Sequence, residues 1–186
     1  SHEQVFCAGA NIHMLGVSSH AWKVNFCKFT NETRCELEDW SEQADVATIC
    51  AITGPCAGGG YELALACDIR IALDEDYDLG SPKINVGLLS GAGGTQRLPR
   101  LIGEGRAFEM IARGRTVSPA EALEWGIISE IVYRDVVARG MGIAEELSRK
   151  SVRAFQNIKL HMPRALDRPL EEGLADERTL FCDVMV

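Results

Sequence analysis

Small residues precede two short stretches of helical composition, and this arrangement could bind an anionic oxygen. The first run is Cys7-Ala8-Gly9-Ala10-Asn11; the second is Gly58-Gly59-Gly60, which leads into Tyr61-Glu62-Leu63-Ala64. A turn of this kind exposes backbone N–H groups, and the start of the helix adds partial positive charge. Two such turns facing each other would stabilise a developing oxyanion.

Glu62 lies in the first turn of the second helix, three residues beyond Gly59. Its carboxylate could reach a group bound at the exposed N–H donors, which is the position that a general base or acid needs. A structural interpretation is open as well. Small residues allow close packing of a helix on a strand, and an acidic residue in a first turn complements the helix dipole.

Hydrophobic periodicity predicts the elements that position these residues. Strands are expected at 46–52, 69–73 and 127–133, and helices at 18–40 and 61–67. The capping sequence Ser118-Pro119-Ala120-Glu121 predicts a further helix, and residues from Asp135 onward have a helical pattern with breaks at prolines. Alternating strands and helices predict an α/β fold with parallel strand pairing.

Several ordered motifs resemble the enoyl-CoA hydratase/isomerase (crotonase) superfamily. They are Phe6-Cys7-Ala8-Gly9-Ala10-Asn11-Ile12, residues 57–68, residues 91–98, Gly114-Arg115 and residues 120–126. The resemblance implies a crotonase (ClpP-like) α/β fold of repeated ββα units with C-terminal helices, truncated at its N-terminus. It implies an α/β core over residues 1–133, incomplete at its start, and a C-terminal helical region of the same domain over residues 134–186.

The resemblance also implies a site for an acyl-CoA thioester. The thioester carbonyl would lie between the N–H groups of Ala10 and Gly59, which form the oxyanion hole. Coenzyme A would run along Ala8, Ala10 and Ile12, and the neighbouring Asn11 and Gly58 complete the expected substrate-binding set. Glu62 matches the first catalytic glutamate of the hydratases.

Lys83 is the main departure from the hydratase pattern. The hydratases carry a second catalytic glutamate after the proline of the segment that here reads Gly80-Ser81-Pro82-Lys83-Ile84. We expect Lys83 to take this catalytic position and to pair with Glu62. Asn11 stands where hydratases often carry aspartate, and the stretch Ser18–Arg34 resembles the benzoyl-CoA-dihydrodiol lyases of the same superfamily.

The resemblance favours hydration of a 2-enoyl-CoA through a thioester enolate. The alternatives are an isomerase, a thioester hydrolase or a ring-cleaving lyase of the same superfamily. A different class is also open, a catalytically weak CoA-binding or assembly homologue, because Lys83 replaces the second glutamate. Coenzyme A would enter as part of the substrate, with no other cofactor and no metal. Members of the superfamily usually form trimers or paired trimers, so the resemblance implies a homotrimer or hexamer.

Composition narrows the partners and the compartment. The 19 basic and 27 acidic residues give a net charge of −8, which disfavours nucleic acid because phosphate binding needs a basic face. No apolar run reaches the roughly eighteen residues that span a bilayer. The seven cysteines are odd in number and form no C-x-x-C pair, so we expect free thiols and a cytoplasmic location.

Other catalytic motifs are missing from the sequence. Residues 91–96 lack the third glycine of a dinucleotide fingerprint and the lysine of a P-loop. Cys56 has no histidine in a recognisable relation, so we expect it to pack rather than to act as a nucleophile. His13 and His20 could share a helix face, but a third metal ligand is missing.

Overall fold

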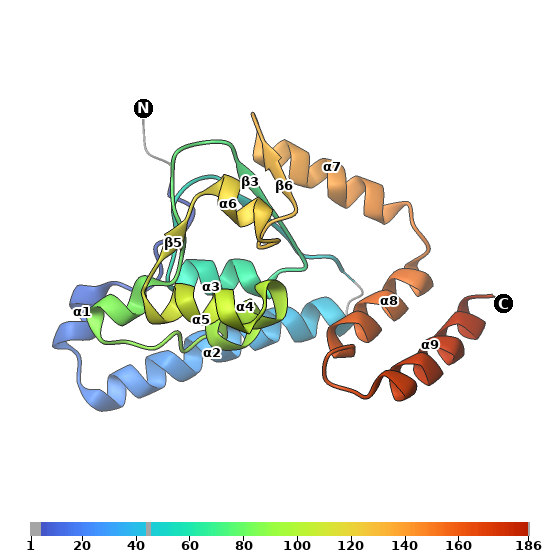
Figure 1. The fold of residues 1–186 in the computed structure, drawn as a ribbon, viewed down its shortest axis with the longest axis horizontal. Coiled ribbons are helices and arrows are strands. Elements are labelled where there is room, and N and C mark those ends of the chain that lie inside the picture. The colour runs from blue at the N-terminus through green and yellow to red at the C-terminus, as the bar shows by residue number, and fades with distance from the viewer. Residues whose placement is uncertain (1–4, 44–45, 186) are drawn as a thin grey trace.

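A computed structural model describes residues 5–43 and 46–185, and it contains two small sheets (Figure 1). The strands of the first sheet are β1 (Ile49–Ile52), β3 (Ile69–Leu73) and β6 (Glu130–Val132), in the order β1-β3-β6. All pairs in it are parallel, with Ile49 opposite Ile69 and Ile71 opposite Glu130. The parallel pairing expected from the alternation of strands and helices is confirmed for this sheet.

The second sheet consists of β2 (Cys56–Ala57), β4 (Leu79–Gly80) and β5 (Thr116–Val117). β2 and β4 are parallel, but β4 and β5 are antiparallel, with Gly80 opposite Thr116. The parallel pairing predicted from the alternation of strands and helices is therefore wrong for β4 and β5, two strands that the sequence analysis did not predict. The physical reason is that a 3-10 helix and two α-helices between β4 and β5 return the chain to the end at which β4 finishes.

Helices make up most of the remaining structure (Figure 1). Before β1 are α1 (Ile12–Val17) and α2 (His20–Gln43), and between β2 and β3 is α3 (Gly59–Ala66). The others are the 3-10 helix η1 (Pro82–Val86), α4 (Gly94–Ile102), α5 (Glu104–Ala112), α6 (Pro119–Glu124), α7 (Val136–Ser148), α8 (Val152–His161), the 3-10 helix η2 (Met162–Arg164) and α9 (Leu170–Val184). The capping prediction is confirmed at α6, where the Ser118 hydroxyl accepts a hydrogen bond from the Glu121 N–H at 3.3 Å.

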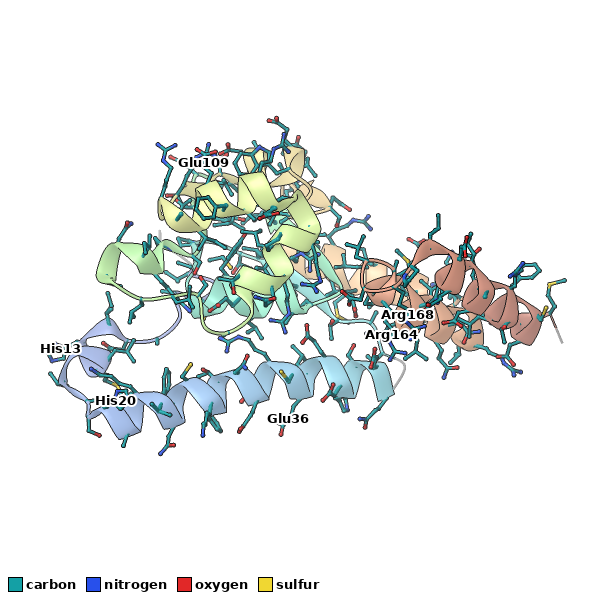
Figure 2. The ribbon with its side chains drawn as sticks, turned by 60° about the horizontal axis from the view of Figure 1, so that its bottom comes forward. His13, His20, Glu36, Glu109, Arg164 and Arg168 are labelled. Carbon is teal, nitrogen blue, oxygen red and sulfur yellow. The ribbon has the colours of Figure 1, made fainter. Side chains whose placement is uncertain are left out.

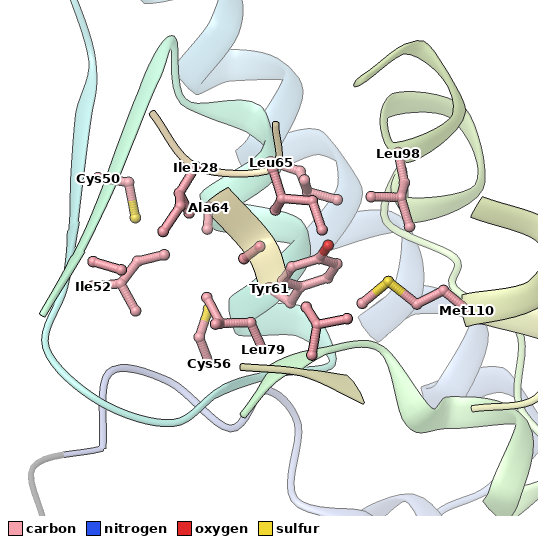
Figure 3. Packing of buried hydrophobic residues seen from close by; sticks show 14 of the residues in the cluster. Cys50, Ile52, Cys56, Tyr61, Ala64, Leu65, Leu79, Leu98, Met110 and Ile128 are labelled. Carbon is pink, nitrogen blue, oxygen red and sulfur yellow. The ribbon is translucent and has the colours of Figure 1, made fainter. Parts of the chain in front are cut away.

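The hydrophobic core surrounds α3, the helix that follows the triple glycine (Figure 3). Tyr61, Ala64 and Leu65 of α3 are buried among Ile52 of β1, Leu79 of β4, Leu98 of α4 and other members of the cluster. This packing fixes the direction of α3, so its first turn projects to a defined point at the edge of the core. The start of α3 is therefore a rigid platform for functional groups.

The C-terminal helices α7, α8 and α9 follow the last strand, as the sequence predicted. α7 packs on the first sheet through Gly140, where an added Cβ would lie 3.6 Å from Ile49 and 3.8 Å from Ile71. Lys159 ties α8 to the segments that precede β1 and β3, because its Nζ donates to Asp68 Oδ2 at 2.7 Å and to the Val46 carbonyl at 2.8 Å. Within residues 5–43 and 46–185, no helix combines the length and the apolarity that crossing a bilayer requires.

Candidate active site

The two glycine-containing turns singled out in the sequence lie against each other. Gly9 has φ +82°, and a Cβ added there would lie 2.5 Å from the Gly59 nitrogen. A Cβ added at Gly60 would lie 2.2 Å from the Cys7 carbonyl oxygen. Because no side chain fits at either position, glycine lets the two turns approach to backbone contact.

Hydrogen bonds hold the second turn against the first turn and against β4. The Ala57 N–H donates to the Cys7 carbonyl and the Gly58 N–H donates to the Gly80 carbonyl, both at 2.9 Å. The N–H groups of Ala10 and Gly59 have no acceptor among the described residues. A Cβ built on Gly59 would lie 3.9 Å from the Ala10 nitrogen, so the two donors are neighbours. They are the pair to which the family resemblance gives the role of an oxyanion hole, a role that stays a prediction.

Glu62 is fully buried, with 0% exposure, and its carboxylate is held by three donors. Oε1 accepts from the N–H groups of Ala92 at 2.8 Å and Gly94 at 3.1 Å. Oε2 accepts from Lys83 Nζ. Gly94 is the first residue of α4, so the carboxylate lies at the positive end of that helix as well as in the first turn of α3.

Lys83 comes from η1, next to the end of β4, and its side chain is 23% exposed. Its Cε lies 3.7 Å from the position of a Cβ on Gly58, so the side chain passes over the triple-glycine turn to reach Glu62. The predicted pairing of Lys83 with Glu62 is confirmed. A buried carboxylate and a half-buried ammonium therefore form an ion pair beside the free N–H groups.

The residues predicted to bind coenzyme A differ in their exposure and in their contacts. Asn11 is the N-cap of α1, and its Oδ1 accepts from the N–H groups of His13 at 3.0 Å and Met14 at 3.4 Å. Ile12 is 61% exposed, and the Ala8 carbonyl lies 3.5 Å from the position of a Cβ on Gly58. The structure thus places Ala8 and Gly58 next to each other, while the Asn11 side chain is used in capping.

Arg34 is a neighbour of the candidate site that the sequence analysis missed. It comes from α2, and its Nη2 donates to the Gly59 carbonyl at 2.9 Å, while Nη1 donates to the Thr30 carbonyl. Its buried Nε has no hydrogen-bond partner among the described residues. Helical periodicity over 18–40 predicts the helix that carries Arg34 but gives no sign of which helix face meets the triple glycine.

Cys56 is the first residue of β2, and its thiol makes no hydrogen bond to any residue that the structure describes. It is fully buried, and burial raises the pKa of its thiol to about 12. A thiol in this state is a poor nucleophile because the thiolate is the reactive form. His13 and His20 do not share a helix face, because they lie on the separate helices α1 and α2 (Figure 2).

Comparison with known proteins identifies the class to which this fold and site belong. The sequence model of the family described as "Enoyl-CoA hydratase/isomerase" matches residues 1–185. The benzoyl-CoA-dihydrodiol lyase of Aromatoleum evansii is 36% identical over 91% of this chain and 31% of its own length. The "Probable enoyl-CoA hydratase echA8" of Mycobacterium leprae is 36% identical over 98% of this chain and 69% of its own length.

Solved structures agree with the sequence comparisons. The crystal structure of an enoyl-CoA hydratase from Bacillus anthracis matches with a TM-score of 0.88 and 34% identity, over 100% of this chain and 70% of the other. One from Geobacillus kaustophilus matches with a TM-score of 0.85 and 37% identity, over 96% of this chain and 67% of the other. The chain belongs to the enoyl-CoA hydratase/isomerase family, and its fold is the α/β crotonase fold expected from the sequence. It spans less than a third of the lyase's length and about two thirds of the hydratases' length.

Proposed function

We propose that this chain binds a 2-enoyl-CoA thioester and hydrates it slowly, through an enolate held by the N–H groups of Ala10 and Gly59. The observation that carries the proposal is the buried Glu62 carboxylate, which extends from the same helical turn that presents the Gly59 N–H. Coenzyme A enters as part of the substrate. Family membership supports the acyl-CoA class of substrate, and the two unpaired N–H groups support polarisation of its carbonyl.

The chemistry would follow from this arrangement. Two N–H donors stabilise negative charge on the thioester oxygen as it develops, which lowers the barrier to addition at Cβ. The oxygen of water would add to Cβ, the double-bond electrons would move onto the thioester carbonyl, and a proton would return to Cα. Glu62 is placed to orient the water and accept its proton, and Lys83 brings a protonated group to the second position.

The Lys83–Glu62 pair makes us expect slow turnover. Both oxygens of Glu62 already accept hydrogen bonds, so a water must compete with Lys83 for Oε2. The same pair favours a second candidate function, a CoA-thioester-binding homologue with little catalytic power. The match to a benzoyl-CoA-dihydrodiol lyase over 91% of the chain favours a third, ring cleavage. Turnover of a panel of acyl-CoA thioesters, with products identified by mass spectrometry, separates the three.

Glu62→Gln tests the hydratase proposal directly. The amide keeps the size and the acceptor for Ala92 and Gly94 but cannot transfer a proton. Hydration of crotonyl-CoA should fall by roughly a hundred- to ten-thousandfold, while binding of the thioester should change little. The exposed Glu124→Gln on α6 is the matched control, and it should keep native turnover. Near-native kcat for Glu62→Gln on every substrate turned over would assign Glu62 a structural role.

We also propose that the chain forms a homotrimer or hexamer, the usual oligomeric state of the superfamily, and that it is located in the cytoplasm. All seven cysteines are free thiols in the structure, which supports a reducing compartment. Light scattering tests the assembly, and a monomer of 20.3 kDa would refute it.

A further inference from the structure

A cavity of about 710 Å³ lies next to the candidate site, between α2, α4 and the segment 163–167. Its lining includes Ser90, Gly91 and Gly93, which belong to the same loop that donates two N–H groups to Glu62. The cavity and the Glu62 carboxylate therefore share this loop.

Helix α2 connects the cavity to the oxyanion pair. Arg34 binds the Gly59 carbonyl, while Asn31 and Glu38, about one turn to either side on the same helix face, line the cavity. Glu36 lies on the opposite side of α2 and points away from the body of the molecule (Figure 2). A thioester held at Gly59 could thus extend its acyl group along this face of α2 into the cavity.

Most of the side chains that line this cavity are polar. Among the described residues that form it, only Leu89 and Pro163 have apolar side chains. A saturated chain would exclude water from polar groups without replacing their hydrogen bonds, which costs free energy. At these polar side chains a tail that carries a hydrogen-bonding group is therefore favoured over a plain hydrocarbon tail.

The charges of the lining are balanced by ion pairs. Arg97 Nε donates to Glu38 Oε1 at 2.7 Å, and Arg100 Nη2 donates to Asp167 Oδ1 at 3.1 Å. Two cations thus meet two carboxylates within the lining, and no net charge is left to select an ionised acyl group.

Neutral hydrogen-bonding groups remain available. The Asn31 amide makes no hydrogen bond within the part of the chain that the structure describes, and Gln96 uses only its Nε2, which donates to Thr95 Oγ1 at 3.3 Å. An amide both donates and accepts, and a hydroxyl group is its natural partner. We propose that the cavity takes a neutral, hydroxylated acyl group, an inference that rests on the proposed binding of an acyl-CoA thioester at Ala10 and Gly59.

Three saturated thioesters that cannot be hydrated test this proposal by calorimetry on the 186-residue chain: hexanoyl-CoA, 6-hydroxyhexanoyl-CoA and adipoyl-CoA. They end in a methyl, a hydroxyl and a carboxylate group. We expect the hydroxylated thioester to bind about three- to tenfold more tightly than hexanoyl-CoA, the range for one net hydrogen bond, and more tightly than adipoyl-CoA. Equal or tighter binding of hexanoyl-CoA, or tightest binding of adipoyl-CoA, would overturn it. Failure of all three to bind better than free coenzyme A would instead refute the underlying thioester site.

Variants locate the effect in the cavity. Asn31→Leu combined with Gln96→Leu should remove the preference for the hydroxyl group and bring hexanoyl-CoA level with it or ahead. Gln43→Leu is the matched control, because Gln43 is exposed on the same helix about 18 Å from Asn31. Its preference should stay native. An unchanged preference in the double variant, with native thermal unfolding, would place the hydroxyl group elsewhere.

Discussion

Replacing Lys83 by glutamate would restore the second carboxylate of a hydratase and so test why this chain should be slow. The Lys83 ammonium donates to Oε2 of Glu62, while Ala92 and Gly94 donate to Oε1. No oxygen of the carboxylate is without a donor. Glu62, the side chain that could position water, is therefore bound by the Lys83 ammonium. Lys83 stands at the position where a hydratase has a second acid or base.

The size of the effect follows from what a positioned acid or base contributes. In a two-carboxylate hydratase one group positions water and the other supplies the proton for Cα. Losing one such group costs about a hundred- to ten-thousandfold in rate, or roughly 3–5 kcal/mol of barrier. We expect Lys83→Glu to raise kcat/KM for crotonyl-CoA by at least about a hundredfold, because it supplies the missing group at the observed contact with Glu62.

The assay follows the loss of the conjugated enoyl absorbance of crotonyl-CoA, with Lys83→Met as the control. Methionine frees Oε2 without adding a carboxylate, so it should give no comparable gain. It removes a hydrogen bond to a charged group, so its unfolding free energy should fall by about 1.5–3 kcal/mol. Native turnover in the range of efficient enzymes, with a kcat/KM of about 10⁴–10⁸ M⁻¹s⁻¹, together with no gain in Lys83→Glu, would refute the reasoning. An equal gain in Lys83→Met would attribute the slowness to the ion pair alone.

Three further predictions concern the framework of the site. Gly9→Ala should lower the unfolding free energy by at least about 1–2 kcal/mol, because φ is +82° and the new Cβ would lie 2.5 Å from the facing turn. The control is Gly105→Ala at an exposed position of α5, which should raise the unfolding free energy by about 0.5–1 kcal/mol. Urea unfolding measures both changes. Burial raises the pKa of the Cys56 thiol to about 12, so between about pH 9 and 12 this thiol is protonated in the folded chain and deprotonated in the unfolded chain. The unfolding free energy should therefore fall as the pH rises through this range, and it should fall less steeply in Cys56→Ala. Equal slopes would contradict the raised pKa. Combining Glu62→Gln with Lys83→Met should leave the unfolding free energy within about 1 kcal/mol of native while turnover is lost, and a large destabilisation would indicate a structural pair.

Local signals in the sequence predicted much of the candidate site. Glycines followed by a first-turn acid placed Glu62 and the Gly59 N–H on one turn, and the structure has them there. The Lys83–Glu62 contact came from a resemblance to the family's motif order, because two residues 21 positions apart have no local relation. The expected parallel pairing is wrong at β5 because the direction of a returning strand depends on how α4 and α5 pack, which local periodicity does not encode.

The two backbone donors that hold Glu62 could not be predicted from sequence patterns. Ala92 and Gly94 act through backbone N–H groups, which every residue other than proline has, so residue type does not identify them. Gly94 has a physical reason to be small, since an added Cβ would lie 3.2 Å from Glu62 Oε1. Sequence patterns could not identify Arg34 either, because its contact with Gly59 depends on how α2 is rotated against the core.

The burial of Glu62 argues against a purely structural role for it. An acid that only complements the dipole of α3 could do so from the surface, where its charge keeps its hydration. Glu62 is instead 0% exposed, and burying a carboxylate costs several kcal/mol that its donors must offset. Apolar residues of similar volume in place of a buried ion pair are often neutral or stabilising. The loop that contains Gly94 and the Lys83 side chain therefore add little to the stability of the fold. They hold one charged carboxylate beside the N–H groups of Ala10 and Gly59, which have no acceptor among the described residues. That arrangement supports the proposed chemistry at those N–H groups.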